Sequence, residues 1–92
     1  MKIKRLIWRP HNEAKLWEHG IDPEEVEDLV EQDNYTVERR AEFPDQVRIT
    51  GHTGRGRWLT IAVQDLGAGD YRPVTGWNAT TQERKDFREK TQ

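Results

Sequence analysis

The sequence predicts a small α+β protein with a single domain over residues 1–92, in which helices pack on one face of an antiparallel sheet. The chain of 92 residues is long enough for one domain and too short for two. Four Trp, two Phe and two Tyr supply large apolar side chains for a core, although 35% of the residues are charged. Alternating apolar residues fill the middle of the chain, and helix-capping patterns stand on both sides of them.

The chain is predicted to begin with a strand and a short helix. Lys2–Trp8 is rich in large apolar residues and is expected to form the strand. After a break at a proline, Glu13–His19 is expected to form the helix. Gly20 suits the left-handed backbone position that commonly ends a helix, so the helix is predicted to stop there.

A second helix is predicted from Asp22 to about Gln32. Asp22 is a favourable N-cap, Pro23 suits the first helical position, and Glu25 stands where a capping box needs it. Apolar residues of this segment recur on one face, and its acidic residues lie on the other. We expect the acidic face either to be solvated or to bind a basic partner.

Four antiparallel strands and a final helix complete the predicted fold. The strands cover Tyr35–Arg40, Gln46–Thr50, Arg57–Gln64 and Tyr71–Trp77, with turns at Glu42–Asp45, Gly51–Gly56 and Leu66–Asp70. The third strand is apolar on both faces, which is typical of a central strand. Thr80 and Glu83 form a second capping box, which opens a helix to about Lys90. The expected order is therefore β-α-α-β-β-β-β-α.

Charge is distributed unevenly along the chain, although the net charge is only −2. Residues 1–20 carry a charge of +3, residues 21–45 carry −8, and residues 46–92 carry +3. A polyanion can bind the basic part of such a protein, provided that the acidic segment faces away from it.

The stretch GHTGRGRWL, residues 51–59, concentrates positive charge at a predicted hairpin. Arg48, Arg55 and Arg57 lie on the two strands or on the loop between them, and register decides whether Arg48 and Arg57 come close. Three glycines in the stretch leave backbone N–H groups accessible, and guanidinium groups match phosphate oxygens in geometry. The hairpin is therefore either a phosphate-binding element or a mobile, solvated loop whose charge aids solubility.

The remaining residue types exclude several classes of site. The chain has no cysteine, so we expect no disulfide and no zinc–thiolate site, in keeping with a reducing cytoplasm. His11, His19 and His52 lack the spacing of a metal site, although a histidine beside arginines can act as general acid or base. No nucleotide-binding motif, membrane-spanning run or signal peptide is apparent, so we expect neither a metal nor a cofactor and no membrane contact.

These features together resemble the BrnT family of bacterial type II toxins, which share the RelE-like ribonuclease fold. The resemblance covers about residues 6–90 and rests on four pieces of sequence. The first is Trp8 with the later His19-Gly20-Ile21, and the second is the helix start Asp22-Pro23-Glu24-Glu25-Val26. The third is a strand pair, formed by Val47-Arg48-Ile49-Thr50-Gly51 and Gly54-Arg55-Gly56-Arg57-Trp58-Leu59-Thr60-Ile61-Ala62-Val63. The fourth is Ala79-Thr80-Thr81-Gln82-Glu83-Arg84. The arginine–glycine strand pair and the final Ala-Thr-x-x-Glu-Arg are the most specific of these.

The resemblance implies a metal-independent ribonuclease toxin that is neutralised by a cognate antitoxin and reaches operator DNA only through that antitoxin. Its reaction would be transesterification, in which the RNA 2′-hydroxyl attacks the adjacent phosphorus. Arg48, Arg55 and Arg57 would then hold the scissile phosphate, and either His19 or His52 would transfer protons. The implied substrate-binding groups also include Gly54, Gly56, Trp77, Arg84 and Lys85.

Two residues depart from the family pattern and favour a different function. The four tryptophans are expected mostly in the core, except Trp77, which is a candidate for stacking on a base. Trp77-Asn78 stands where family members usually carry a basic residue, and Phe87 stands where they often carry tyrosine, which unlike phenylalanine can transfer a proton. The alternatives are a non-catalytic binding module, acting as co-repressor or RNA binder, and a structural subunit that self-associates through exposed strands.

Overall fold

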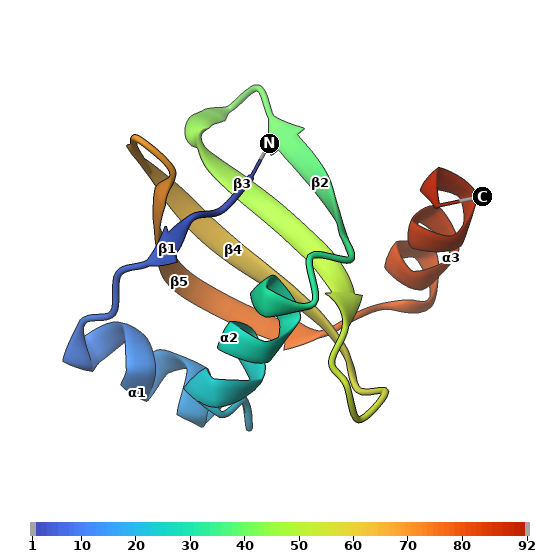
Figure 1. Cartoon of the computed structure of the whole chain (residues 1–92), viewed down its shortest axis with the longest axis horizontal. Coiled ribbons are helices and arrows are strands. Elements are labelled where there is room, and N and C mark those ends of the chain that lie inside the picture. Colours follow the sequence, from blue (N-terminus) through green and yellow to red (C-terminus); the bar gives the residue numbers. More distant parts are fainter. Residues whose placement is uncertain (1, 92) are drawn as a thin grey trace.

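The computed structural model describes residues 2–91 and contains the elements in the predicted order, coloured along the chain in Figure 1. They are β1 (Arg5–Leu6), α1 (Pro10–Glu18), α2 (Pro23–Glu31), β2 (Tyr35–Arg40), β3 (Phe43–His52), β4 (Trp58–Gly67), β5 (Asp70–Asn78) and α3 (Thr81–Lys90). Both predicted capping boxes form, at Asp22 with Glu25 and at Thr80 with Glu83. The predicted α+β class and element order are therefore confirmed.

The sheet is mixed, whereas the sequence predicted an antiparallel one. Its strand order is β1-β5-β4-β3-β2, and the strands from β2 to β5 form the predicted antiparallel meander. β1 instead runs parallel to β5, with Arg5 opposite Asp70 and Leu6 opposite Tyr71. Because the chain passes through two helices and the whole meander before β5 reaches β1, nothing local could determine the direction of this pairing.

Two prolines lie within strands, Pro44 next to the start of β3 and Pro73 inside β5. Pro44 follows Phe43, the first residue of β3, so the predicted turn over Glu42–Asp45 is shorter than expected. Pro73 is buried opposite Val63, beside a bulge in the β4–β5 pairing. Bulges and strand starts are the places where a sheet tolerates the missing N–H of proline.

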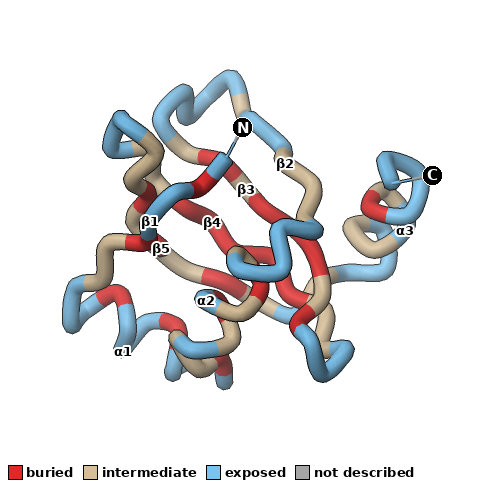
Figure 2. The backbone as a smooth tube through the Cα atoms, in the orientation of Figure 1, coloured by how far each residue is buried: buried red, intermediate tan, exposed pale blue. Residues whose placement is uncertain are grey.

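The hydrophobic core lies between α1, α2 and one face of the sheet, which we call the core face. Figure 2 shows the buried residues concentrated in the middle of β3, β4 and β5. Leu16 from α1 and Leu29 from α2 are fully buried there, and so are Ile49, Ile61 and Val63 from the strands. Each of these strand residues is odd-numbered, as expected when alternate side chains of β3 and β4 point to one face.

The third helix packs on the opposite face of the sheet, which we call the α3 face. Phe87 of α3 is buried against His52 and Trp58, which are cross-strand partners and belong to the even-numbered set. Figure 1 accordingly shows α3 apart from α1 and α2. The prediction that helices cover only one face of the sheet is therefore wrong for α3.

The tryptophans are less buried than predicted. Trp17 on α1 is 56% exposed, and the other three are only partly buried. Trp8 packs against the core and donates a hydrogen bond to Glu27. Within residues 2–91, no helix is both long enough and apolar enough to cross a bilayer.

Candidate nucleic-acid interface

The α3 face gathers basic and aromatic side chains from three neighbouring strands. Cross-strand pairing places Thr50 opposite Thr60 and Thr60 opposite Trp77, while His52 lies opposite Trp58. The hydroxyls of Thr50 and Thr60 lie 2.8 Å apart and form a hydrogen bond in the buried floor of this face. The alternation of side chains along each strand therefore determines which residues lie on the α3 face.

Three arginines lie over the tryptophan rings of this face. The guanidinium carbon of Arg48 lies 5.1 Å from the ring centroid of Trp77. Those of Arg84 and Arg88 lie 5.3 Å and 5.8 Å from a ring centroid of Trp58. Stacking on an indole ring holds a guanidinium group by cation–π attraction and leaves its N–H edge available to a ligand.

None of these three arginines forms an ion pair among residues 2–91. No carboxylate within residues 2–91 lies within 4.0 Å of Arg48, Arg84 or Arg88. Glu38 is the cross-strand partner of Arg48 on β2, yet it also stays beyond that distance. The α3 face is thus a cationic and aromatic surface, as expected for binding phosphates and bases.

The capping box of α3 also orients Trp77. The carboxylate of Glu83 accepts hydrogen bonds from the Thr80 N–H at 2.8 Å and from Trp77 Nε1 at 3.1 Å. The Thr80 hydroxyl in turn accepts a hydrogen bond from the backbone N–H of Glu83. One carboxylate therefore both starts the helix and directs the indole on which Arg48 lies.

His52 is the histidine of this face, and an imidazole can act as general acid or base. Its ring meets Trp58 and Phe87 edge-on, with centroid distances of 5.1 Å and 5.9 Å. Its Nδ1 lies 3.3 Å from the backbone carbonyl of Thr53. In the tautomer with hydrogen on Nδ1, Nδ1 donates a hydrogen bond to this carbonyl, and the unprotonated Nε2 can accept a proton.

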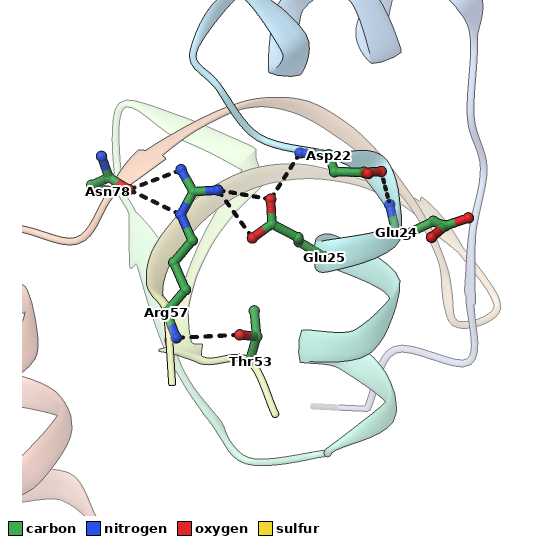
Figure 3. Close-up of polar contacts among 6 residues, drawn as sticks. All are labelled: Asp22, Glu24, Glu25, Thr53, Arg57 and Asn78. Carbon is green, nitrogen blue, oxygen red and sulfur yellow. Dashed lines mark hydrogen bonds and ion pairs between the residues drawn. The ribbon is translucent and has the colours of Figure 1, made fainter. Parts of the chain in front are cut away.

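Arg57 lies on the other side of the sheet and is bound by the acidic helix, as Figure 3 shows. Its Nη1 donates to both carboxylate oxygens of Glu25, at 2.7 Å and 3.0 Å, and its Nη2 donates to Asn78 at 3.1 Å. Arg57 lies beyond the pair of His52 and Trp58, which is the last pair of β3 and β4, whereas Arg48 lies farther back on β3, opposite Ala62. The expectation that Arg48 and Arg57 could come close is therefore wrong, because they face opposite sides.

We expect Arg57→Gln to lower the free energy of unfolding by about 1–2 kcal/mol, because the charge-assisted hydrogen bonds to Glu25 are lost. Urea unfolding followed by circular dichroism measures this. Arg55→Gln removes the same charge from the exposed hairpin and should change stability little, because the Arg55 guanidinium has no carboxylate within 4.0 Å among residues 2–91. Equal stability of both variants would contradict the role given to the Arg57–Glu25 pair.

The backbone N–H groups of the hairpin glycines Gly54 and Gly56 form hydrogen bonds within the protein and are not free for a ligand. The Gly54 N–H donates to the Asp28 carboxylate at 2.7 Å, and the Gly56 N–H donates to the Thr53 carbonyl at 2.8 Å. Arg55 at the tip lines an open cavity of about 600 Å³, together with acidic residues of α2. The hairpin is thus docked on the acidic segment through Gly54, and Arg55 lies at its exposed tip.

The remaining candidates from the sequence fall into two groups. Arg84 and Trp77 belong to the α3 face, and Lys85 is exposed on the same helix. His19 caps the exposed end of α1, the helix that packs on the core face. Within the described residues, no three His, Asp or Glu side chains lie close enough together to bind a metal ion.

Sequence reasoning missed Trp58 and Arg88, although each had a detectable signal. Trp58 follows the alternation of β4 and shares the face of Thr60 and Ala62. Arg88 stands four residues after Arg84, which places both on one side of a helix.

Comparisons with known proteins show similarity in structure and not in sequence. No family model matches the chain, and no curated protein matches it. Among solved structures, the chain is similar to the ribonuclease toxin BrnT of Brucella abortus, with a TM-score of 0.62 and 15% identity. The match covers 84% of this chain and 97% of that one. The fold implied by the resemblance is therefore confirmed: the chain has the fold of the BrnT ribonuclease toxin.

Proposed function

We propose that this protein is the toxin of a type II toxin–antitoxin system and cleaves RNA on the α3 face. One observation carries the proposal: three arginines without an ion pair among residues 2–91 lie over tryptophan rings on the face that holds His52. Arg84 and Arg88 lie over Trp58, which contacts His52, and Arg48 lies over Trp77. The shared fold with a ribonuclease toxin supports it. Cationic groups beside aromatic rings suit a single RNA strand, because the former bind phosphates and the latter stack on bases.

The proposed reaction needs no group outside the RNA and the protein. The 2′-oxygen attacks the adjacent phosphorus while a base removes its proton, and the bond from phosphorus to the 5′-oxygen breaks. An acid then protonates that 5′-oxygen, so the products end in a 2′,3′-cyclic phosphate and a 5′-hydroxyl. Arg48 stabilises the charge that develops on the phosphoryl oxygens, which is the role of a positioned cation in such a transition state.

His52 is the proposed proton-transfer residue, rather than His19. It shares the α3 face with the three arginines, whereas His19 ends α1 on the other side of the molecule. The resemblance placed Gly54 and Arg57 around the phosphate, but we assign both to holding the hairpin against α2. We assign Gly56, which it also placed there, to closing the hairpin through its hydrogen bond to Thr53, and Arg55 lies at the exposed tip.

The proposed partners and location are those that the resemblance to the BrnT family implies. A cognate antitoxin neutralises the toxin in the cytoplasm and provides the contact with operator DNA. The acidic face of α2 lies beyond the core, away from the α3 face, so its charge does not oppose RNA on that face.

Induced expression in a bacterial host tests the proposal. Wild type is expected to arrest growth and to produce cellular RNA fragments with 2′,3′-cyclic phosphate ends, and Arg48→Gln is expected to do neither. Normal growth and intact RNA with wild type, at equal protein levels, would contradict the ribonuclease function.

A second candidate is a binding module on the same face without catalysis. His52 is enclosed edge-on by Trp58 and Phe87, and neither ring transfers a proton. The indole of Trp77 occupies the place where family members usually carry a basic residue. This candidate predicts that wild type binds RNA without producing cyclic phosphate ends, so the same RNA analysis separates the two functions.

A further inference from the structure

Two arginines on α3 are held together without any counterion among the described residues. Arg84 and Arg88 stand four residues apart and lie over the same indole, that of Trp58. Like charges at this helical spacing repel each other. Neither has a carboxylate within 4.0 Å in residues 2–91, although α3 itself carries three acidic residues.

Arg84 is also partly withdrawn from water. Its Nε atom is buried and has no hydrogen-bond partner within residues 2–91. Desolvating part of a cation without pairing it is unfavourable. Phe87 is the buried residue of α3, and Arg84 and Arg88 lie over Trp58 of β4, so both arginines stand at the contact between the helix and the sheet. An anion bound there would supply the missing charge and the missing hydrogen-bond acceptor.

The chemistry of the pair favours a phosphate group. Two guanidinium groups offer forked N–H donors that match phosphate oxygens, and stacking on Trp58 limits their rotation before the ligand arrives. Trp58 and Trp77 are diagonal neighbours on adjacent strands, because Trp77 lies opposite Thr60, two residues beyond Trp58. Their Cα atoms are therefore about 7–8 Å apart, and one strand of nucleic acid can reach the arginines over both rings.

We propose that Arg84 and Arg88 form a second phosphate subsite, which binds the RNA strand next to the phosphate held by Arg48. This inference rests on the proposed function for the choice of RNA as ligand. The strand is then held at two points along the α3 face, and binding of RNA also fastens α3 to the sheet.

The salt dependence of binding tests the second subsite. A short single-stranded oligonucleotide of mixed sequence with 2′-deoxyribose keeps the phosphates but cannot be cleaved by transesterification. Its affinity is measured by fluorescence anisotropy at several salt concentrations. Each phosphate contact contributes about −0.7 to the slope of log K against log salt for a single strand. Arg84→Gln/Arg88→Gln should therefore reduce the magnitude of the slope by about 0.7, and Arg48→Gln by a similar amount.

Lys90→Gln is the matched control, because it removes a charge from the exposed end of the same helix. Its slope should equal that of wild type. If the double variant does not fold, Arg88→Gln alone serves, since that side chain is exposed. A slope for the arginine variants equal to that of Lys90→Gln would overturn the subsite. So would a wild type that does not bind the oligonucleotide, a result that points instead to a protein carboxylate as the ligand.

The outcome is separable from that of the proposed function, because this strand is bound and not cut. A reduced slope together with intact cellular RNA would establish the subsite and reject the ribonuclease. If wild type cleaves RNA but the arginine variants keep the wild-type salt slope, the ribonuclease function stands and the second subsite is rejected.

Discussion

Replacing His52 with Asn is expected to lower the rate of RNA cleavage about 100- to 10,000-fold, the range that a positioned general acid or base supplies. His52 contacts Trp58 on the α3 face, and an Asn side chain cannot act as general acid or base. RNA binding should change little, since the three arginines remain in place. The measurement is the cleavage rate in a cell-free translation system, which also contains ribosomes.

His19→Asn is the matched control, because it makes the same chemical change at the exposed end of α1. It should cleave RNA at the wild-type rate. The pair of variants also decides between the two histidines that the sequence left open. Loss of cleavage in His19→Asn with full activity in His52→Asn would refute the assignment of the active site to the α3 face. Circular dichroism of both variants shows whether each is folded.

Gly51→Ala is expected to destabilise the protein by about 1–3 kcal/mol, because a single added methyl group has no space. A Cβ at this position would lie 2.7 Å from the Asn34 carbonyl oxygen and 3.0 Å from Leu29. The backbone there cannot move easily, since Gly51 pairs with Tyr35 on one side and with Leu59 on the other. For a domain of this size, we expect the melting temperature to fall by roughly 5–20 °C.

Gly54→Ala provides the comparison within the same hairpin. Its added Cβ would meet only side-chain atoms, Gln32 Nε2 at 3.3 Å and Asp28 Oδ2 at 3.4 Å, and both side chains can shift. Its stability should stay within about 0.5 kcal/mol of wild type. Should Gly51→Ala melt at the wild-type temperature, the glycine would not be required by packing, and a ligand-binding role for it would regain support.

The sequence alone predicted those features that depend on neighbouring residues. Asp22 with Glu25 and Thr80 with Glu83 form capping boxes because their side chains reach backbone groups only two or three residues away. The core strands follow the alternation of apolar residues, which is a local property of extended chain. Spacing of such motifs along the chain was enough to suggest the fold of a BrnT-like toxin, which the structural comparison confirms.

Only the tertiary structure decided where the basic residues act. Arg48 lies over Trp77 on the α3 face. Arg57, just before β4, lies against Glu25 on the other side of the sheet, however close the two arginines appear in the sequence. The partner of Arg57 is Glu25, 32 residues away, and no local pattern indicates such a pair. The parallel β1 and the side on which α3 packs are likewise set by long-range contacts. These contacts divide one basic stretch into a hairpin bound to the acidic helix and a cationic face that remains open to a ligand.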